Sequence, residues 1–324
     1  MLLTLIDHDR GSLEGSSLEM LTLARQVADE LNQPMEAVLI GEAARPLAED
    51  LGAYGVSTVH LIQHEKLDDY APEGWASSIL QLMTSLSPEA LAAPGTDRGN
   101  EVLAHVAAIS DQPMAANCTA VLPGDVYSVT RLRWGGSLLE EATLQGNPKL
   151  FSVALHAIEA RELTVPGSVN VKSFAPELAE KDLRVRLVDR EEAVSDKVSL
   201  AEARVVVGGG RGVGAPEGFD PLESLADLLG GAVGGSRVAT NLGWRPHADQ
   251  IGQTGTRIAP DLYIACGISG AIQHMVGCMG SKNILAINTD REAPIMDKAD
   301  YAVIGDLKEI LPALIEAIEA QGTA

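Results

Sequence analysis

Residues 262–274 read LYIACGISGAIQH, an apolar run that leads into a glycine-containing turn and then a helical pattern. This order predicts a buried strand, a tight turn and a helix starting near Ala271, which is the repeating unit of a parallel α/β sheet. Free N–H groups at such a strand-to-helix junction favour a negatively charged ligand. His274 is either a packed helix residue or a ligand contact. The candidate binding residues in this stretch are Ser269, Gly270, Ala271, Ile272, Gln273 and His274.

The rest of the second half repeats this alternation. Strand patterns cover residues 204–207, 283–287 and 301–304, helical patterns cover 221–229 and 307–320, and a further element opens at 237–240. Strands that alternate with helices imply crossover connections and a parallel sheet. We therefore expect a compact doubly wound domain over residues 198–324.

The first half has the same rhythm and then changes character. Strand patterns at residues 2–6, 36–40, 58–61, 90–93 and 116–121 alternate with helical patterns at 17–31, 43–51, 76–86 and 100–109. The segments 127–134, 150–154 and 163–174 are β-rich and separated by turn signals, and 183–188 is a possible last strand. These patterns predict an N-terminal α/β domain, residues 1–197, whose mostly parallel sheet carries an antiparallel extension.

The composition excludes several classes of protein. With 324 residues, 46% of them hydrophobic and 21% charged, the chain has ample material for about two folded domains. A net charge of −21 disfavours nucleic acid and anionic lipid as partners. The start, MLLTLIDHDR, lacks the basic region of a signal peptide. The three cysteines are scattered, which disfavours a disulfide scaffold or a metal site and favours the cytoplasm.

Two glycine-rich motifs are candidate phosphate sites. In VVVGGGRG, residues 205–212, consecutive glycines after a strand bring backbone N–H groups close to a ligand, and Arg211 adds a permanent charge. The alternative is a plain tight turn. In GGSR, residues 234–237, Ser236 is expected to cap a helix with Arg237 in its first turn. A helix cap beside a surface arginine is the structural alternative.

Two further sets of polar residues follow predicted strands or lie in loops. The loop IGQTGT, residues 251–256, offers Ile251, Gly252, Gln253 and Thr254 either as a plain turn or as contacts to a ring rich in heteroatoms. Asn288 and Asp306 follow the last two strands, at the edge where open α/β sheets bind ligands. Asp306 is suited to ribose hydroxyls, to capping the helix that starts at Leu307, or to both.

Motifs for other chemistries do not occur in this sequence. It has no G-x-S-x-G elbow, no H-E-x-x-H and no Walker A motif, and no paired-carboxylate arrangement stands out. The missing G-x-G-x-x-G fingerprint also argues against a nicotinamide-dependent dehydrogenase. The pattern instead indicates a protein that carries a phosphate-bearing cofactor. None of the motifs looks like a catalytic nucleophile with its base.

Taken in order, these motifs resemble the α subunit of electron transfer flavoprotein, the large, FixB-like subunit. The resemblance is densest over residues 203–324, in VVVGGGRG, GGSR, IGQTGT, DLYIACGISGAIQH, SKNILAINTDREAPI and ADYAVIGDL. The first 200 residues resemble the family in their order of elements and in VTRLRWGG followed by the LFSV strand. The resemblance implies an FAD-binding C-terminal domain and a partner-facing N-terminal domain to which no cofactor role is assigned.

The resemblance also implies roles for single residues. Arg211 and Ser236 would lie on the pyrophosphate side, and Arg237 would lie against the isoalloxazine ring. The loop Ile251–Thr254 would contact the flavin and its ribityl chain, with the Thr254 hydroxyl near N5. The segment Ser269–His274 would lie beside the pyrimidine edge, with His274 near O2. The adenosine end would be held by Asn288, Asp306 and Leu307.

This resemblance implies an electron carrier rather than an enzyme that converts a substrate. Reduction puts negative charge on N1 and O2 of the flavin, which Arg237, His274 and the helix start would stabilise, raising the first reduction potential. The chain would pair with a β subunit, accept electrons from dehydrogenases such as those of fatty acid β-oxidation, and pass them to a quinone oxidoreductase. The β subunit would carry AMP or, in an electron-bifurcating variant, a second FAD. A non-redox module that binds an adenine dinucleotide remains the alternative from another class.

Overall fold

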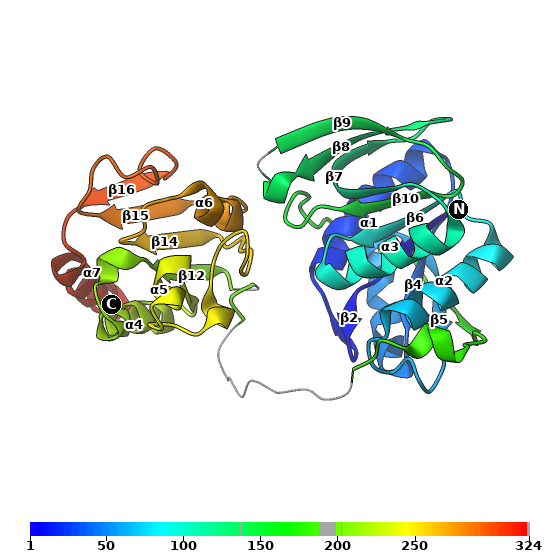
Figure 1. Ribbon diagram of the computed structural model, residues 1–324, viewed down its shortest axis with the longest axis horizontal. Coiled ribbons are helices and arrows are strands. Elements are labelled where there is room, and N and C mark those ends of the chain that lie inside the picture. The colour runs from blue at the N-terminus through cyan, green and yellow to red at the C-terminus, as the bar shows by residue number, and fades with distance from the viewer. Residues whose placement is uncertain (137, 188–198, 202, 323–324) are drawn as a thin grey trace. The chain divides into compact units, whose positions relative to one another are not determined.

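The computed structural model describes residues 1–136, 138–187, 199–201 and 203–322. The fold divides into two compact units, Met1–Glu191 and Glu192–Ala324, and each unit has its own main sheet (Figure 1). The domain boundary expected at residues 197–198 lies outside the described residues.

The main sheet of the first unit is mostly parallel. Its nine strands lie in the order β11-β5-β4-β1-β6-β10-β7-β8-β9, and among the described residues its antiparallel pairs are β7–β8 and β8–β9. The expected parallel sheet with an antiparallel extension is confirmed. The strands are β1 Leu2–Leu5, β4 Met35–Ile40, β5 Val56–Ile62, β6 Ala90–Pro94, β7 Met114–Leu122, β8 Tyr127–Arg133, β9 Leu138–Leu144, β10 Lys149–Val153 and β11 Asn170–Phe174, with a small hairpin of β2 His8–Asp9 and β3 Ser12–Leu13.

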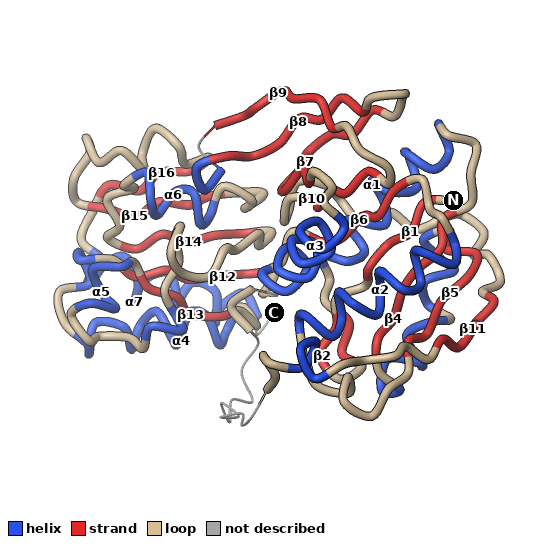
Figure 2. The backbone as a smooth tube through the Cα atoms, turned by 45° about the vertical axis from the view of Figure 1, so that its right-hand side comes forward, coloured by secondary structure: helices blue, strands red, loops and turns tan. Residues whose placement is uncertain are grey.

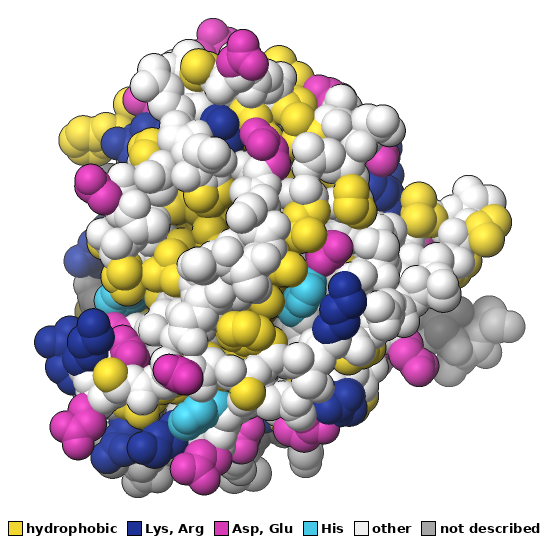
Figure 3. Space-filling view, turned by 90° about the vertical axis from the view of Figure 1, so that its right-hand side faces the viewer, with side chains coloured by type: hydrophobic (Ala, Val, Ile, Leu, Met, Phe, Trp, Pro, Cys, Tyr) yellow, Lys and Arg dark blue, Asp and Glu magenta, His cyan; other side chains and the backbone are white. Residues whose placement is uncertain are grey.

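Helices cover both faces of this sheet (Figure 2). Helix α1, Ser16–Glu30, packs on one face through Met20 and Leu21. Helices α2, Pro72–Leu86, and α3, Asp97–Ser110, pack on the other face, and the two faces form separate apolar cores. Charged side chains of both signs are interspersed on the face in Figure 3, so the acidic excess does not form a single patch there.

Four expectations for the first unit were wrong in detail. Residues 43–51 form no α-helix: Pro46 lies within a 3-10 helix, Glu42–Ala48, and a second one follows at Asp50–Tyr54. The segment 150–154 does not belong to the antiparallel extension, because its fully buried apolar run is typical of a parallel strand and forms β10 between β6 and β7. Of 163–174, only β11 is a strand, and it lies parallel to β5 at the opposite edge. Residues 183–187 form no strand, and 188 lies outside the described residues.

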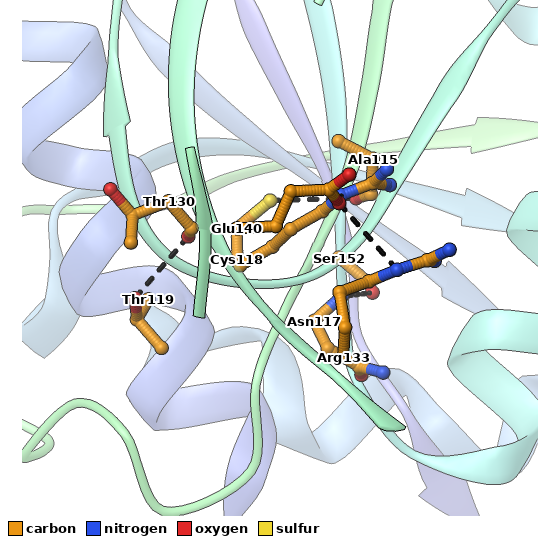
Figure 4. A network of polar contacts seen from close by, with 9 residues as sticks. Ala115, Asn117, Cys118, Thr119, Thr130, Arg133, Glu140 and Ser152 are labelled. Carbon is orange, nitrogen blue, oxygen red and sulfur yellow. Dashed lines mark hydrogen bonds and ion pairs between the residues drawn. The ribbon is translucent and has the colours of Figure 1, made fainter. Parts of the chain in front are cut away.

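Polar contacts join the strands of the antiparallel extension (Figure 4). The Thr119 hydroxyl donates to the carbonyl of Thr130 at 3.2 Å, which links β7 to β8. Arg131 on β8 donates to the Glu140 carboxylate on β9 at 2.6 Å, and Arg133 lies 3.5 Å from the same group. β9, which has two adjacent glutamates and little apolar alternation, was not expected from the sequence.

The second unit is a parallel sheet of five strands in the order β13-β12-β14-β15-β16. Its apolar cores lie on both faces, one with α4 and α7 and the other with α6, so the doubly wound architecture is confirmed. The sequence did not indicate β13, whose residues AVGG carry almost no strand signal. The elements are β12 Val205–Gly209, β13 Ala232–Gly235, β14 Leu262–Cys266, β15 Ile284–Asn288 and β16 Tyr301–Ile304, with α4 Asp220–Leu228, α5 Arg237–Asn241, α6 Ile272–Cys278 and α7 Leu307–Gly322.

Candidate functional site

A cleft of about 700 Å³ lies in the second unit, at the carboxyl ends of its strands. The chain leaves β12 for β13 on one side, whereas it leaves β14 for β15 on the other side, so the strand order reverses between β12 and β14. Open α/β sheets bind ligands at such a switch point. The predicted residues that line the cleft are Arg211, Ser236, Arg237, Ile251, Gly252, Gln253, Thr254, Ser269, Ala271, Gln273, His274 and Asn288.

Backbone atoms form one wall of the cleft. Gly210 N donates to Cys266 O at 2.9 Å, and Gly212 N donates to Gly267 O at 3.0 Å. A Cβ on Gly210 would lie 2.3 Å from Gly267 O, and Gly267 itself has a φ of +62°. The glycines are therefore needed where the loops after β12 and β14 touch. The N–H groups of Gly210 and Gly212 donate within the protein, whereas the sequence predicts that they donate to a ligand.

Two arginines line the cleft, and neither side chain has a partner among the residues that the structure describes. The side chains of Arg211 and Arg237 are exposed, and within the described part of the chain neither has a hydrogen-bond or ion-pair partner. Ser236 caps α5, as expected, because its hydroxyl accepts from Ala239 N at 3.4 Å. Unpaired guanidinium groups in one cleft favour an anionic ligand such as a pyrophosphate.

Gln250 organises the loop that contains Thr254. Its side chain is 1% exposed. The Thr240 hydroxyl donates to Gln250 Oε1 at 3.0 Å, and Gln250 Nε2 donates to Thr254 Oγ1 at 2.9 Å. Because the Thr254 oxygen already accepts this bond, its own proton is available for a ligand in the cleft. The same loop is joined to α6 by Gln253 N, which donates to Gln273 O at 2.7 Å.

His274 is a buried and neutral member of the cleft. Its Nε2 lies 2.8 Å from the Tyr263 hydroxyl, whereas its buried Nδ1 has no hydrogen-bond partner in the structure. Burial lowers the pKa of His274 from 6.5 to about 4, although a backbone interaction with Ile251 opposes this shift. His274 is among the residues that line the cleft, and its neutral imidazole has one buried nitrogen that still needs a hydrogen-bond partner.

The lowered pKa of His274 predicts a pH-dependent stability. The unfolded chain takes up this proton near pH 6.5 and the folded chain only near pH 4, so the contribution to folding is present above pH 6.5 and is lost as the pH falls. Between pH 7 and 5.5 it should cost the FAD-free protein about 1 kcal/mol of unfolding free energy. Urea unfolding at both pH values measures this. His274→Gln should lose that increment, and an identical pH dependence in both proteins would contradict the prediction.

Four predicted residues lie outside the cleft lining. Gly270 has a φ of +81°, and a Cβ there would lie 2.5 Å from Ile295 N, so this glycine is required for packing. Ile272 is 71% exposed. Asp306 and Leu307 follow β16, next to Asn288, whose carbonyl accepts from Gly305 N at 3.1 Å.

Asp306 caps α7, because its Oδ1 accepts from Lys308 N at 2.9 Å. Replacing Asp306 with alanine should therefore lower the unfolding free energy by about 1 kcal/mol, the usual value of a lost N-cap. Chemical denaturation measures this loss. Asp306→Asn, which keeps an acceptor oxygen, should retain most of the stability, and an unchanged Asp306→Ala protein would show that the cap contributes nothing.

The sequence analysis missed several residues of the site. Asp290 lines the cleft. Gln250 is hydrogen-bonded to Thr254, and Tyr263 is hydrogen-bonded to His274. Asp290 and Tyr263 stand inside stretches already singled out, and Gln250 directly precedes the loop at Ile251. Only the three-dimensional contacts distinguish them from their neighbours.

Other features bear on metal and membrane chemistry. In the described part of the chain, no group of three or more His, Cys, Asp or Glu side chains is arranged to hold a metal ion. Among the helices described, none is both long and apolar enough to cross a lipid bilayer. The three cysteines are buried free thiols.

A switch-point cleft lined by two exposed arginines and a buried neutral imidazole defines the second unit as a nucleotide-binding α/β domain. Residues 199–279 match the family model "Electron transfer flavoprotein FAD-binding domain", and residues 2–179 match "Electron transfer flavoprotein domain". This chain therefore belongs to the electron transfer flavoprotein α-subunit family, and its second unit is the FAD-binding domain.

Relatives along the whole chain agree with this assignment. Electron transfer flavoprotein subunit alpha of Thermoanaerobacterium thermosaccharolyticum is 36% identical, covering 97% of this chain and 96% of the relative. The subunit of the same name from Mycobacterium leprae is 38% identical, with 98% of each chain covered. Protein FixB of Clostridium saccharobutylicum is 37% identical over 95% of this chain and 93% of its own.

Proposed function

We propose that this chain holds FAD in the switch-point cleft and acts, together with a β subunit, as a soluble-phase electron carrier between dehydrogenases and a quinone oxidoreductase. The observation that carries the proposal is that one cleft is lined both by two arginines that have no side-chain partner in the described part of the chain and by His274, whose buried Nδ1 has no hydrogen-bond partner in the structure. The arginines suit a ligand with a pyrophosphate, and the imidazole nitrogen suits a polar ring edge. FAD has both features.

The cleft residues suit FAD along its length. Arg211 and Ser236 would hold the pyrophosphate beside the glycine wall, and Arg237 would lie against the flavin ring. Thr254, whose oxygen already accepts from Gln250, would donate its proton to a ring nitrogen. The adenosine end would lie toward the strand ends that carry Asn288, Asp306 and Leu307.

When bound, FAD supplies a ring that takes up and releases electrons one at a time or in pairs. The residues of this chain would set how readily it does so. The Arg237 guanidinium and a hydrogen bond from His274 would favour negative charge on the ring edge, which raises the potential of the first reduction. The remaining cleft residues bind and orient, and none of them needs to transfer a proton to a substrate.

The family assignment supports a proposal for the partners of this chain. The first unit would face the β subunit, on which AMP or a second FAD would lie, and the second FAD would make the complex an electron-bifurcating variant. Donor dehydrogenases would include those of fatty acid β-oxidation. The scattered cysteines favour a reducing compartment, the cytoplasm.

Stepwise reduction of the chain, purified together with its β subunit, tests this function. We expect a yellow complex whose visible spectrum passes through a one-electron state before full reduction, and which a donor dehydrogenase reduces in the presence of its substrate. Two flavins per complex would favour the bifurcating variant. A flavin that binds but is neither reduced by a dehydrogenase nor reoxidised by a quinone oxidoreductase would leave only a dinucleotide-binding module.

A further inference from the structure

The partner of His274 in the interior is Tyr263 on β14. The Tyr263 hydroxyl lies 2.8 Å from His274 Nε2, and the two rings are 6.1 Å apart between centroids. Tyr263 has no exposed surface, and its hydroxyl packs over Gly208, where a Cβ would come within 2.4 Å of it. A glycine at position 208 therefore makes room for the tyrosine hydroxyl.

The hydrogen bond between these residues has a defined direction. Burial raises the pKa of Tyr263 well above 10, so the hydroxyl keeps its proton. Among the described residues, His274 Nε2 is the single hydrogen-bond partner of this hydroxyl. If Nε2 carried the imidazole proton instead, the Tyr263 proton would be buried without an acceptor, which is costly in a protein interior. Donation from Tyr263 to Nε2 avoids that cost.

We propose that Tyr263 is a positioning residue that holds His274 as the Nδ1–H tautomer, so that the imidazole presents a donor to a carbonyl oxygen of the ligand ring. The proton of a neutral imidazole sits on one nitrogen, and the nitrogen that accepts from Tyr263 cannot carry it. The buried Nδ1 makes no hydrogen bond of ordinary geometry in the structure, although the Ile251 backbone acts on the ring, so the proton on Nδ1 still lacks a well-placed acceptor. The second half of this inference rests on the proposed binding of FAD in the cleft.

The tautomer can be measured without FAD. In the full chain labelled with ¹⁵N-histidine and stripped of flavin, long-range ¹H–¹⁵N correlation at pH 7 identifies the protonated nitrogen, and His274→Gln assigns the signal. We expect a protonated Nδ1 and an unprotonated Nε2. A protonated Nε2, or a doubly protonated ring, would overturn the proposal, whatever the chain binds.

Tyr263→Phe tests the role of the hydroxyl. It should convert most of His274 to the Nε2–H form and weaken FAD binding by about 10-fold, the effect of one lost donor. The matched control is Tyr301→Phe, because Tyr301 on β16 is 63% exposed. This variant should change neither the tautomer of His274 nor the affinity for FAD. An unchanged tautomer in Tyr263→Phe would also overturn the proposal.

Adding FAD tests the donation from His274 to the ligand separately from the tautomer that Tyr263 sets. A large shift of the Nδ1 signal on binding supports donation to the ligand. If FAD binds without moving that signal, the donor role is wrong although the tautomer assignment stands. If no FAD binds, the proposed function fails, whereas the spectra of the flavin-free chain still decide the role of Tyr263.

Discussion

Replacing Gly277 with alanine is expected to destabilise the FAD-binding unit by about 3 kcal/mol or more, because the new methyl group collides with backbone. Gly277 lies in α6, and a Cβ there would be 2.4 Å from both the Cα and the N of Gly252. Gly252 has a φ of +149° and belongs to the loop that carries Thr254, so relief of the collision would displace the cleft itself. We therefore expect loss of bound FAD along with loss of stability, measured by urea unfolding and by released flavin.

Gly235→Ala is the matched control for this substitution. The nearest atom to a Cβ on Gly235 would be Ala239 Cβ at 3.6 Å, an ordinary contact. This variant should retain both stability and FAD, although Gly235 adjoins the cleft residue Ser236. Equal stability of the two alanine variants would show that α6 and the Gly252 loop are not packed as described.

Replacing Arg237 with glutamate is expected to weaken FAD binding by about 100-fold or more. The change removes a charge-assisted hydrogen-bond donor and places a carboxylate next to an anionic ligand, and each effect costs affinity. Stability should change little, because the Arg237 side chain is exposed and has no partner within the described residues. Flavin fluorescence quenching during titration of the stripped protein measures the dissociation constant.

Lys298→Glu controls for the change in net charge. Lys298 is exposed and does not line the cleft, so this variant should bind FAD normally. A comparable loss in both variants would mean that overall charge, rather than contact, governs affinity. Normal binding by Arg237→Glu would place the anionic part of the ligand elsewhere.

The sequence was most informative where short apolar runs end in glycine or polar residues. The strand patterns near Leu262, Asn283 and Tyr301 became β14, β15 and β16, and most residues singled out after β14 and β15 line one cleft, whereas Asp306 and Leu307 after β16 do not. Such a site can be predicted because the carboxyl ends of parallel strands share one edge of a sheet. Residues that follow separate strands therefore come together, whatever the strand order is.

Strand order and buried contacts were beyond reach from a single chain. The apolar segment at Leu150 reads equally well as an edge or a central strand, and only its burial between β6 and β7 decides. The Tyr263–His274 pair is another case, since the hydrogen bond joins a strand to a helix through the interior. Gln250 likewise looks like an ordinary loop residue until its bonds to Thr240 and Thr254 are seen.

The central claim is that FAD occupies the switch-point cleft of the second unit. Hydrogen–deuterium exchange of the complex with and without its flavin tests it most directly, because backbone protection reports where the ligand lies. We predict that FAD slows exchange in peptides covering residues 208–212, 250–256 and 267–274, and that Arg237→Glu abolishes this protection at the same FAD concentration. Protection confined to the first unit, with those three segments unchanged, would contradict the account.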